Sequence, residues 1–218
     1  KTFVSGFSKF NATTFGLGEF KNDSLIIYNE SNGTIQPKAN CAVTIGNNNE
    51  IIYSTYGSGF SIFDGENFIN YNTENGLSNN NVEEIAVDSK NNYWIALDGG
   101  AVQMFDGENF NQHKIKDGVS SDESFTLYVD DLDNVWVGTY GGGVCFYDGN
   151  IWNSIDSRDG LHNNTIKSIC GSNGNKYWFG SRDGITSYNP KHQTPKIFVE
   201  KIETTNESYN FSENFEKK

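Results

Sequence analysis

The sequence predicts an all-β protein, and more specifically a β-propeller built from four-stranded blades. The main observation is a strand–turn–strand unit that recurs every 42 residues, with clear copies beginning at Trp94, Trp136 and Trp178. Propeller blades take roughly 40 to 45 residues and four strands each. The units also lack the apolar period of an α-helix, and the 23 glycines of the 218-residue chain suit a fold with many tight turns.

One repeat unit, residues 82–123, contains four short runs rich in apolar residues, with turn residues between them. The turns read Ser-Lys-Asn-Asn after the first run, Asp-Gly-Gly after the second and Asp-Gly-Glu-Asn after the third. Such clusters of Asp, Asn, Ser and Gly favour hairpin turns. We therefore expect four antiparallel strands, at residues 82–88, 93–97, 101–105 and 110–115.

The same spacing divides the chain into five units, near residues 1–40, 41–81, 82–123, 124–165 and 166–190. The first strands of the other four units are expected at residues 2–5, 41–45, 125–130 and 166–171. Phe10 takes the place of the tryptophan in the first unit, so that copy is degenerate. Propellers span about 4 to 8 blades, so five units either close a ring or form part of a larger one.

The repeat ends after Pro190. Residues 191–196 are expected to form a linker and residues 197–202 a strand of a new element. In the polar stretch that follows, Tyr209, Phe211 and Phe215 alternate with polar residues, as in a half-buried strand. We interpret residues 191–218 as a linker and the first strands of a further β domain. No apolar run approaches the roughly 20 residues of a transmembrane helix, and no basic-then-apolar leader opens the chain.

The formal charge of −12 repels nucleic acid and anionic membrane surfaces and favours neutral or cationic partners. The three cysteines, Cys41, Cys145 and Cys170, have neither zinc-cluster spacing nor the even number of a complete disulfide framework. The acidic run at residues 130–134 lacks the ligand spacing of a calcium loop and corresponds to ordinary turns in other units. We expect no metal and no cofactor.

Propellers bind ligands mainly where the turns between second and third strands and the connections between blades meet around the central axis. Tyrosine rings stack on apolar faces, while acid and guanidinium groups bind hydroxyls. The repeat selects Tyr56, Asp98, Tyr140 and Arg182 in the turns, in the position of Thr14, and Asn80, Asp122, Asn164 and His162 in the connections. These eight are the candidate ligand-binding residues. The alternative is that they are solvated turn tips.

The tryptophans at the start of the repeats share one position flanked by apolar residues, which favours packing between blades over a carbohydrate platform. No motif of a serine hydrolase, a zinc protease or a phosphate-binding loop occurs. No catalytic residue is therefore assigned. An acid pair such as Asp98 and Asp122 could serve a hydrolase only at a separation that the sequence does not give.

Several of these features, taken together, resemble the repeat of the two-component regulator propeller family. The matching segments are 136–139 (Trp-Val-Gly-Thr), 147–148 (Tyr-Asp), 160–161 (Gly-Leu), 166–169 (Ile-Lys-Ser-Ile), 76–77 (Gly-Leu) and 82–88. The resemblance covers residues 40–190 clearly and 1–39 faintly. Ile52, Ala96 and Leu97 depart from the motif, so the earlier units are looser copies. Residues 195–202 look like the entry into the immunoglobulin-like Tyr-Tyr-Tyr domain that follows such propellers.

The resemblance implies a periplasmic or extracellular sensor region of a bacterial two-component system, which detects an oligosaccharide-like ligand without catalysis. Its partners would be that ligand, the downstream immunoglobulin-like and signalling domains of the same polypeptide and, in a homodimer, a second copy. Two alternatives stay open. One is a structural or protein-interaction propeller in a secreted or envelope assembly, and the other is a propeller lyase or glycoside hydrolase.

Overall fold

The computed structural model describes residues 2–5, 17–35, 39–172, 176–190, 201–203 and 208–210. Over these residues the chain is all-β, with two single-turn 3-10 helices, η1 (Glu30–Asn32) and η2 (Ile115–Asp117). The strands form five sheets of consecutive antiparallel strands and one separate hairpin. The expected all-β class is confirmed.

Three of the sheets have four strands each, and every strand pairs with the next one in sequence, as in propeller blades. Their strands are β4 (Ala39–Ile45), β5 (Ile51–Tyr56), β6 (Gly59–Phe63) and β7 (Phe68–Tyr71); β8 (Val82–Val87), β9 (Tyr93–Leu97), β10 (Ala101–Phe105) and β11 (Phe110–His113); and β12 (Ser124–Val129), β13 (Val135–Thr139), β14 (Val144–Tyr147) and β15 (Trp152–Ile155). The strand expected at residues 110–115 ends earlier, at His113, because η2 begins at Ile115.

The first sheet contains β1 (Thr2–Ser5), β2 (Leu17–Lys21) and β3 (Ser24–Tyr28). Residues 2–5 do form a strand, but β1 pairs directly with β2, with Thr2 opposite Phe20. Repeat spacing assigns β2 to the third strand of a unit, so β1 lies where a second strand was expected. The second strand expected near Phe10, with Thr14 in its turn, lies outside the described residues.

The fifth sheet contains β16 (Ile166–Ser172), β17 (Lys176–Ser181) and β18 (Gly184–Tyr188). Beyond it, β19 (Lys201–Glu203) pairs with β20 (Ser208–Asn210) in a short hairpin. The strand expected at residues 197–202 overlaps β19 in its last two residues, and the rest of it lies outside the described residues.

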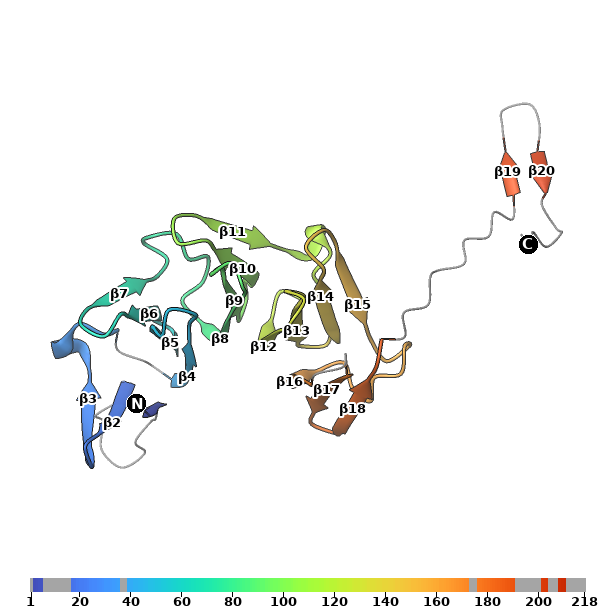
Figure 1. Cartoon of the computed structure of the whole chain (residues 1–218). Helices are drawn as coiled ribbons and strands as arrows, with labels where there is room; N and C mark the ends of the chain where they lie inside the picture. The colour runs from blue at the N-terminus through green and yellow to red at the C-terminus, as the bar shows by residue number, and fades with distance from the viewer. Residues whose placement is uncertain are drawn as a thin grey trace.

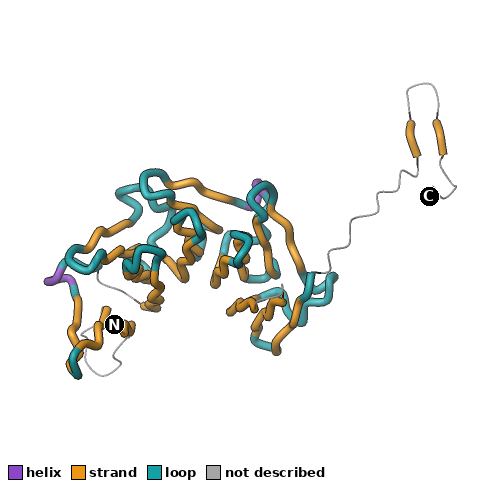
Figure 2. The backbone as a smooth tube through the Cα atoms, in the orientation of Figure 1, coloured by secondary structure: helices purple, strands orange, loops and turns teal. Residues whose placement is uncertain are grey.

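The five sheets follow one another along an arc (Figure 1). The strands β4, β8, β12 and β16 lie on the inner side of the arc, and β3, β7, β11 and β15 lie on the outer side. The first sheet and the fifth sheet are at the two ends of the arc, and turns and loops connect the strands at both edges of each sheet (Figure 2). Inner strands around a common axis and outer strands at the rim are the arrangement of a β-propeller.

The hydrophobic core lies between neighbouring sheets. Trp94, 5% exposed, belongs to a cluster that joins the third sheet to the fourth, and Trp136, 2% exposed, belongs to one that joins the fourth to the fifth. Both tryptophans are therefore core residues, as predicted. Trp178 occupies the same repeat position in the fifth sheet but is only half-buried, with Lys176 Nζ 5.1 Å from its ring centre.

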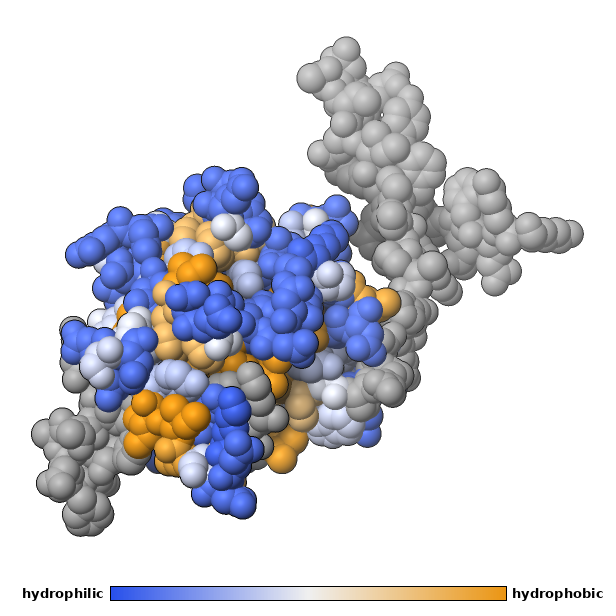
Figure 3. Space-filling model, turned by 60° about the vertical axis from the view of Figure 1, so that its left-hand side comes forward, coloured by the Kyte–Doolittle hydropathy of each residue, from blue (hydrophilic) through white to orange (hydrophobic). Residues whose placement is uncertain are grey.

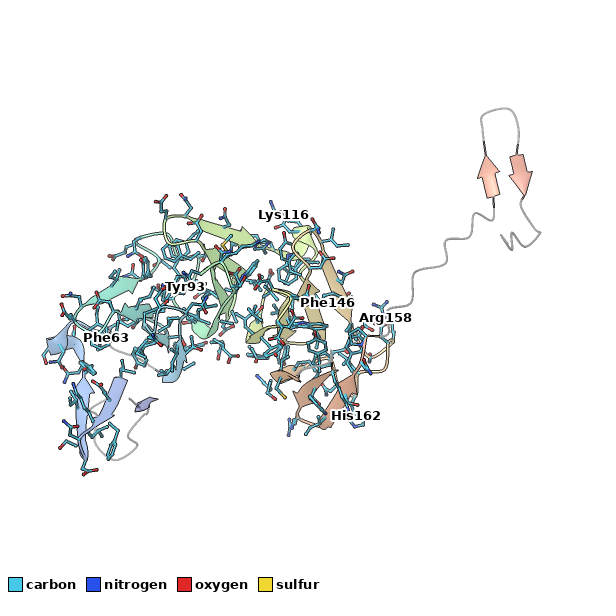
Figure 4. The ribbon with its side chains drawn as sticks, viewed as in Figure 1. Phe63, Tyr93, Lys116, Phe146, Arg158 and His162 are labelled. Atoms are coloured by element: carbon cyan, nitrogen blue, oxygen red, sulfur yellow. The ribbon has the colours of Figure 1, made fainter. Side chains whose placement is uncertain are left out.

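The same inter-sheet packing holds the other aromatic side chains. Tyr93 packs against the cluster between the second and third sheets, and Phe146 packs against the cluster between the fourth and fifth (Figure 4). The face of the molecule shown in Figure 3 is mostly hydrophilic, with apolar patches between the hydrophilic side chains. Large apolar side chains are exposed on β2 and β3 of the first sheet, namely Phe20, Leu25, Ile26 and Ile27.

Each of the two buried tryptophans donates its indole N–H to a buried carboxylate. Asp88 Oδ2 accepts a hydrogen bond from Trp94 Nε1 at 3.0 Å, and Asp130 Oδ2 accepts one from Trp136 Nε1 at 2.8 Å. The same carboxylates accept backbone N–H groups of their own turns. The acidic run at residues 130–134 is thus a structural turn, and the described residues contain no cluster of metal-ligating side chains.

No described helix is long and apolar enough to cross a membrane.

Candidate functional site

Four of the inner strands begin with a β-bulge: the one in β4 lies between Ala39 and Cys41, and the other three follow the repeat. In these three the pairing register shifts between Val82 and Glu84, between Ser124 and Thr126, and between Ile166 and Ser168. A bulge leaves one residue unpaired and re-aims its side chain. The bulged residues of these three strands are Glu83, Phe125 and Lys167, which are spaced 42 residues apart.

Each bulged residue has a neighbour in the turn after the second strand of its sheet. In the third sheet, Val82 pairs with Leu97, and the bulged Glu83 and the turn residue Asp98 lie on either side of this pair. In the next two sheets, Phe125 and Tyr140 flank the Ser124–Thr139 pair in the same way, and Lys167 and Arg182 flank the Ile166–Ser181 pair. We call these three pairs and Tyr56 the axial cluster, because they lie at one end of the inner strands.

The third sheet contributes an acidic pair to the axial cluster. Burial raises the pKa of Glu83, the negative charge of Asp98 raises it further, and Lys167 opposes both. Tyr56, from the second sheet, donates its hydroxyl hydrogen to Asp98 Oδ2 at 2.5 Å. This hydrogen bond is the main reason why the pKa of Tyr56 is raised, and the fields of Glu83 and Glu123 contribute.

The fourth sheet contributes an aromatic pair. The rings of Phe125 and Tyr140 meet edge to face, with centroids 5.9 Å apart and planes at 84°. Tyr140 is 57% exposed, and exposed tyrosine rings in clefts are suited to stacking on ligands. Lys167 Nζ from the fifth sheet lies 2.9 Å from the centroid of Phe125.

The fifth sheet contributes a basic pair, Lys167 and Arg182, both exposed. Among the described residues, neither Lys167 nor Arg182 forms an ion pair. The ammonium group of Lys167 lies on the Phe125 ring, and such a cation–π contact contributes about 0.5–1 kcal/mol at exposed sites. The axial cluster therefore presents an acidic, an aromatic and a basic pair on three consecutive sheets.

The structure brings the four turn candidates, Tyr56, Asp98, Tyr140 and Arg182, to this one end of the sheets. Two of the candidates in the connections between sheets use their side chains within their own loops instead. Asn80 Oδ1 accepts Thr73 N–H at 2.8 Å, and Asn164 Oδ1 accepts Ser157 N–H at 2.7 Å, so both side chains brace their own loops.

The two remaining candidates lie on loops between sheets. The carbonyl of Asp122 accepts Ala101 N–H at 2.7 Å, while its exposed carboxylate makes no hydrogen bond to the described residues. His162 is exposed, and its backbone N–H donates to Thr186 Oγ1 at 3.2 Å. In Figure 4 His162 lies beside β18.

Sequence reasoning missed the bulged residues Glu83, Phe125 and Lys167. The strands containing them were expected to alternate regularly, and an alternating pattern gives no sign of a bulge. One signal was present: this repeat position holds an acid, an aromatic residue and a base in successive units, whereas the tryptophan position repeats one residue type in the same three units.

The fold is thus that of a β-propeller-like, all-β protein whose inner strand ends carry a mixed polar and aromatic cluster. No family model and no curated protein matches the chain. Several solved structures share its fold at 12% to 18% sequence identity, too low to show more than the fold.

One of these is the extracellular domain of the putative hybrid two component system BT3049 from B. thetaiotaomicron, with a TM-score of 0.68 and 17% identity over 91% of this chain and 30% of that one. Another is PorZ, a surface component of the type-IX secretion system of Porphyromonas gingivalis, with a TM-score of 0.63 and 15% identity over 90% of this chain and 32% of that one. A streptogramin B lyase has a TM-score of 0.62 and 12% identity over 82% of this chain and 63% of that one. The chain thus spans less than a third of the first two proteins.

Proposed function

We propose that this chain is the ligand-binding propeller of a bacterial two-component sensor, that it acts outside the cytoplasm without catalysis, and that it binds an oligosaccharide-like ligand at the axial cluster. The observation that carries the proposal is the contrast between constant and variable repeat positions. In the third and fourth sheets the core tryptophans Trp94 and Trp136 and their buried acceptors Asp88 and Asp130 are the same, whereas the bulge and turn positions change from acid to aromatic to base over the third, fourth and fifth sheets.

In two units a polar side chain ties the connection between sheets to the backbone of the turn. Asn79 Nδ2 donates to the Asp98 carbonyl at 2.7 Å, and Ser121 Oγ donates to the Tyr140 carbonyl at 3.0 Å. These contacts fix the backbone of the turn while leaving its side chain free. A rigid scaffold that presents variable side chains on turns is typical of binding sites.

Two proteins of similar fold support the sensor part of the proposal, because they are extracellular domains of a putative hybrid two-component system and a putative one-component system. On this proposal, the five repeat units belong to a propeller with a repeat of about 42 residues that is part of a larger ring. Residues 191–218 lead into a following β domain, and the signal passes to that domain and to signalling domains of the same polypeptide, with a homodimer as the signalling form.

Calorimetric titration of the protein with a panel of neutral and charged oligosaccharides tests the proposal. We expect at least one to bind, and we expect Tyr140→Ala to weaken that binding about tenfold or more, because a stacking ring is lost. Phe20→Ala is the matched control, since Phe20 is a comparably exposed ring, 50% exposed, on the first sheet. If no oligosaccharide binds, or if both variants bind alike, the proposal is wrong.

The apolar side chains exposed on β2 and β3 favour a second candidate, a protein-interaction propeller. Leu25, Ile26 and Ile27 are 48%, 41% and 39% exposed on one strand, and apolar patches of this kind often mark protein contacts. In that case Ile26→Ser should abolish co-purification with an envelope partner while leaving oligosaccharide binding unchanged. Retention of the partner by this variant would argue against the second candidate.

A further inference from the structure

We propose that the axial cluster recognises a zwitterionic ligand, one in which a protonated amine and an anionic group flank a sugar ring. The inference rests on the proposed function and specifies the chemical class of the ligand at that site. It derives from the order of the three pairs on consecutive sheets: Glu83 and Asp98, then Phe125 and Tyr140, then Lys167 and Arg182.

The acidic pair forms the pole for the amine. Glu83 and Asp98 are of like charge and flank the Val82–Leu97 pair, and the negative charge of Asp98 adds to burial in raising the pKa of Glu83. Tyr56 occupies one carboxylate oxygen of Asp98 and leaves the other oxygen and the Glu83 carboxylate as acceptors. A protonated amine has three donors, and charge-assisted hydrogen bonds to carboxylates are among the strong ones.

The aromatic pair forms the floor between the poles. The Tyr140 ring is exposed, and the Phe125 ring is covered by the ammonium group of Lys167. An apolar ring face of a ligand can replace that ammonium group, which is then free to bind an anionic group. The half-buried Phe125 ring therefore becomes available to a ligand when the exposed Lys167 side chain moves aside.

The basic pair forms the pole for the anionic group. In a protein with a formal charge of −12, the exposed Lys167 and Arg182 side chains have no ion pair with any described carboxylate. Arginine beside lysine suits a carboxylate or sulfate, because the guanidinium fork binds two oxygens and the ammonium adds a point charge.

The acidic pair is not explained by stability, because neighbouring groups of like charge repel each other and lower the stability of the folded state. Asp98 forms an isolated bridge with Glu123, two residues before Phe125, and Lys167 Nζ lies 2.9 Å from the centroid of the Phe125 ring. Both poles therefore adjoin the aromatic pair, and a ligand the size of one or two sugar rings can reach both.

Four disaccharides separate the contributions of the two poles. They are a glucuronate–glucosamine disaccharide with a free amine, its N-acetylated form, which lacks the positive charge, diglucosamine, which lacks the negative charge, and cellobiose, which is neutral. By titration calorimetry at low salt we expect the zwitterion to bind about tenfold or more tightly than each of the other three. Added salt should reduce that preference, because the basic pole is exposed and the acidic pole is only partly buried.

Two double variants test whether the named residues form the two poles. Glu83→Gln with Asp98→Asn should abolish the preference for the free amine over its N-acetylated form. Lys167→Gln with Arg182→Gln should abolish the preference for the zwitterion over diglucosamine. The matched controls are Glu108→Gln and Lys21→Gln, which alter exposed charges on outer turns and should keep both preferences.

Thermal unfolding shows whether the variants are folded. Each double variant should melt close to the temperature of the unchanged protein, because the substituted side chains are exposed or only partly buried and none belongs to the core between the sheets. Equal binding of cellobiose and the zwitterion, or preferences that survive both double variants, would overturn the zwitterion inference while the proposed function stands. Failure of all four disaccharides and of the wider oligosaccharide panel would overturn both.

Discussion

At the scale of single residues, the Asp130 carboxylate connects three parts of the molecule. Its Oδ2 accepts hydrogen bonds from Trp136 Nε1 at 2.8 Å, Asn134 Nδ2 at 2.9 Å and the Tyr177 hydroxyl at 2.7 Å. Burial alone would raise the pKa of Asp130, but these three donors outweigh burial and hold the pKa below its ordinary value. The side chain is therefore a charged acceptor that joins a turn, a core tryptophan and the next sheet.

The lowered pKa of Asp130 predicts an acid-dependent loss of stability. A carboxyl group whose pKa is lower in the folded than in the unfolded state stabilises the fold above the unfolded value, about 3.9, and this contribution is lost as the pH falls through the folded pKa. The difference in free energy of unfolding between the protein and Asp130→Asn should be constant from about pH 7 to 5 and shrink below about pH 4. Urea denaturation at each pH measures it. A difference that stays constant or grows below that pH would contradict the assignment.

In the second sheet, a different residue supplies the carboxylate that Asp88 and Asp130 supply in the third and fourth sheets. Gly46 stands at the repeat position of Asp88 and Asp130, and Glu50 stands at the position of Asn92. A Cβ atom at Gly46 would lie 2.0 Å from Glu50 Oε1, so the glutamate carboxylate occupies the space of the missing aspartate. Glu50 Oε1 also accepts the Tyr93 hydroxyl at 2.9 Å, as Asp130 accepts Tyr177.

A double-mutant cycle tests this exchange. Gly46→Asp alone should destabilise the protein by about 1–3 kcal/mol, because two carboxylates would compete for one buried site. Glu50→Asn alone should also destabilise it, because Tyr93 loses its acceptor. The double variant should restore most of the stability, with a coupling free energy of about 1–3 kcal/mol from denaturant unfolding. Additive effects would show that the two positions are independent.

At the scale of strands and sheets, stability comes from the faces that neighbouring sheets bury against each other. Trp136 stacks on Phe146 of its own sheet, with ring centroids 4.5 Å apart, and on Tyr177 of the next sheet at 4.1 Å. Trp178 stands at the same position in the fifth sheet without such a neighbour among the described residues and is half-buried. The same residue type thus has different energetic roles in two sheets.

Substitution of the two tryptophans should separate these roles. Trp136→Ala should lower the free energy of unfolding by about 3–5 kcal/mol, the usual cost of a large-to-small change in a core. Trp178→Ala should cost about half as much or less, because part of its surface is already exposed to water. Denaturant unfolding of both variants measures the difference, and an unchanged melting temperature for Trp136→Ala would contradict its place in the core.

At the scale of the whole molecule, the place of a sheet along the arc determines how far its neighbours shield it from solvent. The second, third and fourth sheets have a neighbour on both faces, and their second strands β5, β9 and β13 are almost wholly buried. The strands β3 and β18, in the sheets at the two ends of the arc, are mostly exposed. Because stability in repeat arrays depends on contacts between neighbours, the ends should open first.

Hydrogen exchange followed by mass spectrometry tests this gradient. Peptides from β5, β9 and β13 should exchange most slowly, and peptides from β3 and β18 should exchange faster by several orders of magnitude, since local opening there needs less free energy. The middle of the arc serves as the internal control. Uniform protection across all five sheets would mean that something covers the end sheets in solution.

Much of the fold could be predicted because it depends on local patterns that repeat. The apolar runs and Asp-Gly turns predicted the strands of the second, third and fourth sheets, and the shared position of Trp94 and Trp136 predicted their burial. The first sheet was harder, since Phe10 replaces the tryptophan there and the pattern is weak. Its β1 pairs with β2 in a register that the repeat spacing did not indicate.

By itself the sequence determined the all-β class, the repeated sheets and the candidate turn residues Tyr56, Asp98, Tyr140 and Arg182, because turn chemistry and side-chain alternation act over a few neighbouring residues. The tertiary structure alone revealed the bulges that bring Glu83, Phe125 and Lys167 beside those turn residues. It also showed that Asn80 and Asn164 brace loops. These facts depend on which strands pair and in which register, and register is set by packing between residues far apart in the chain.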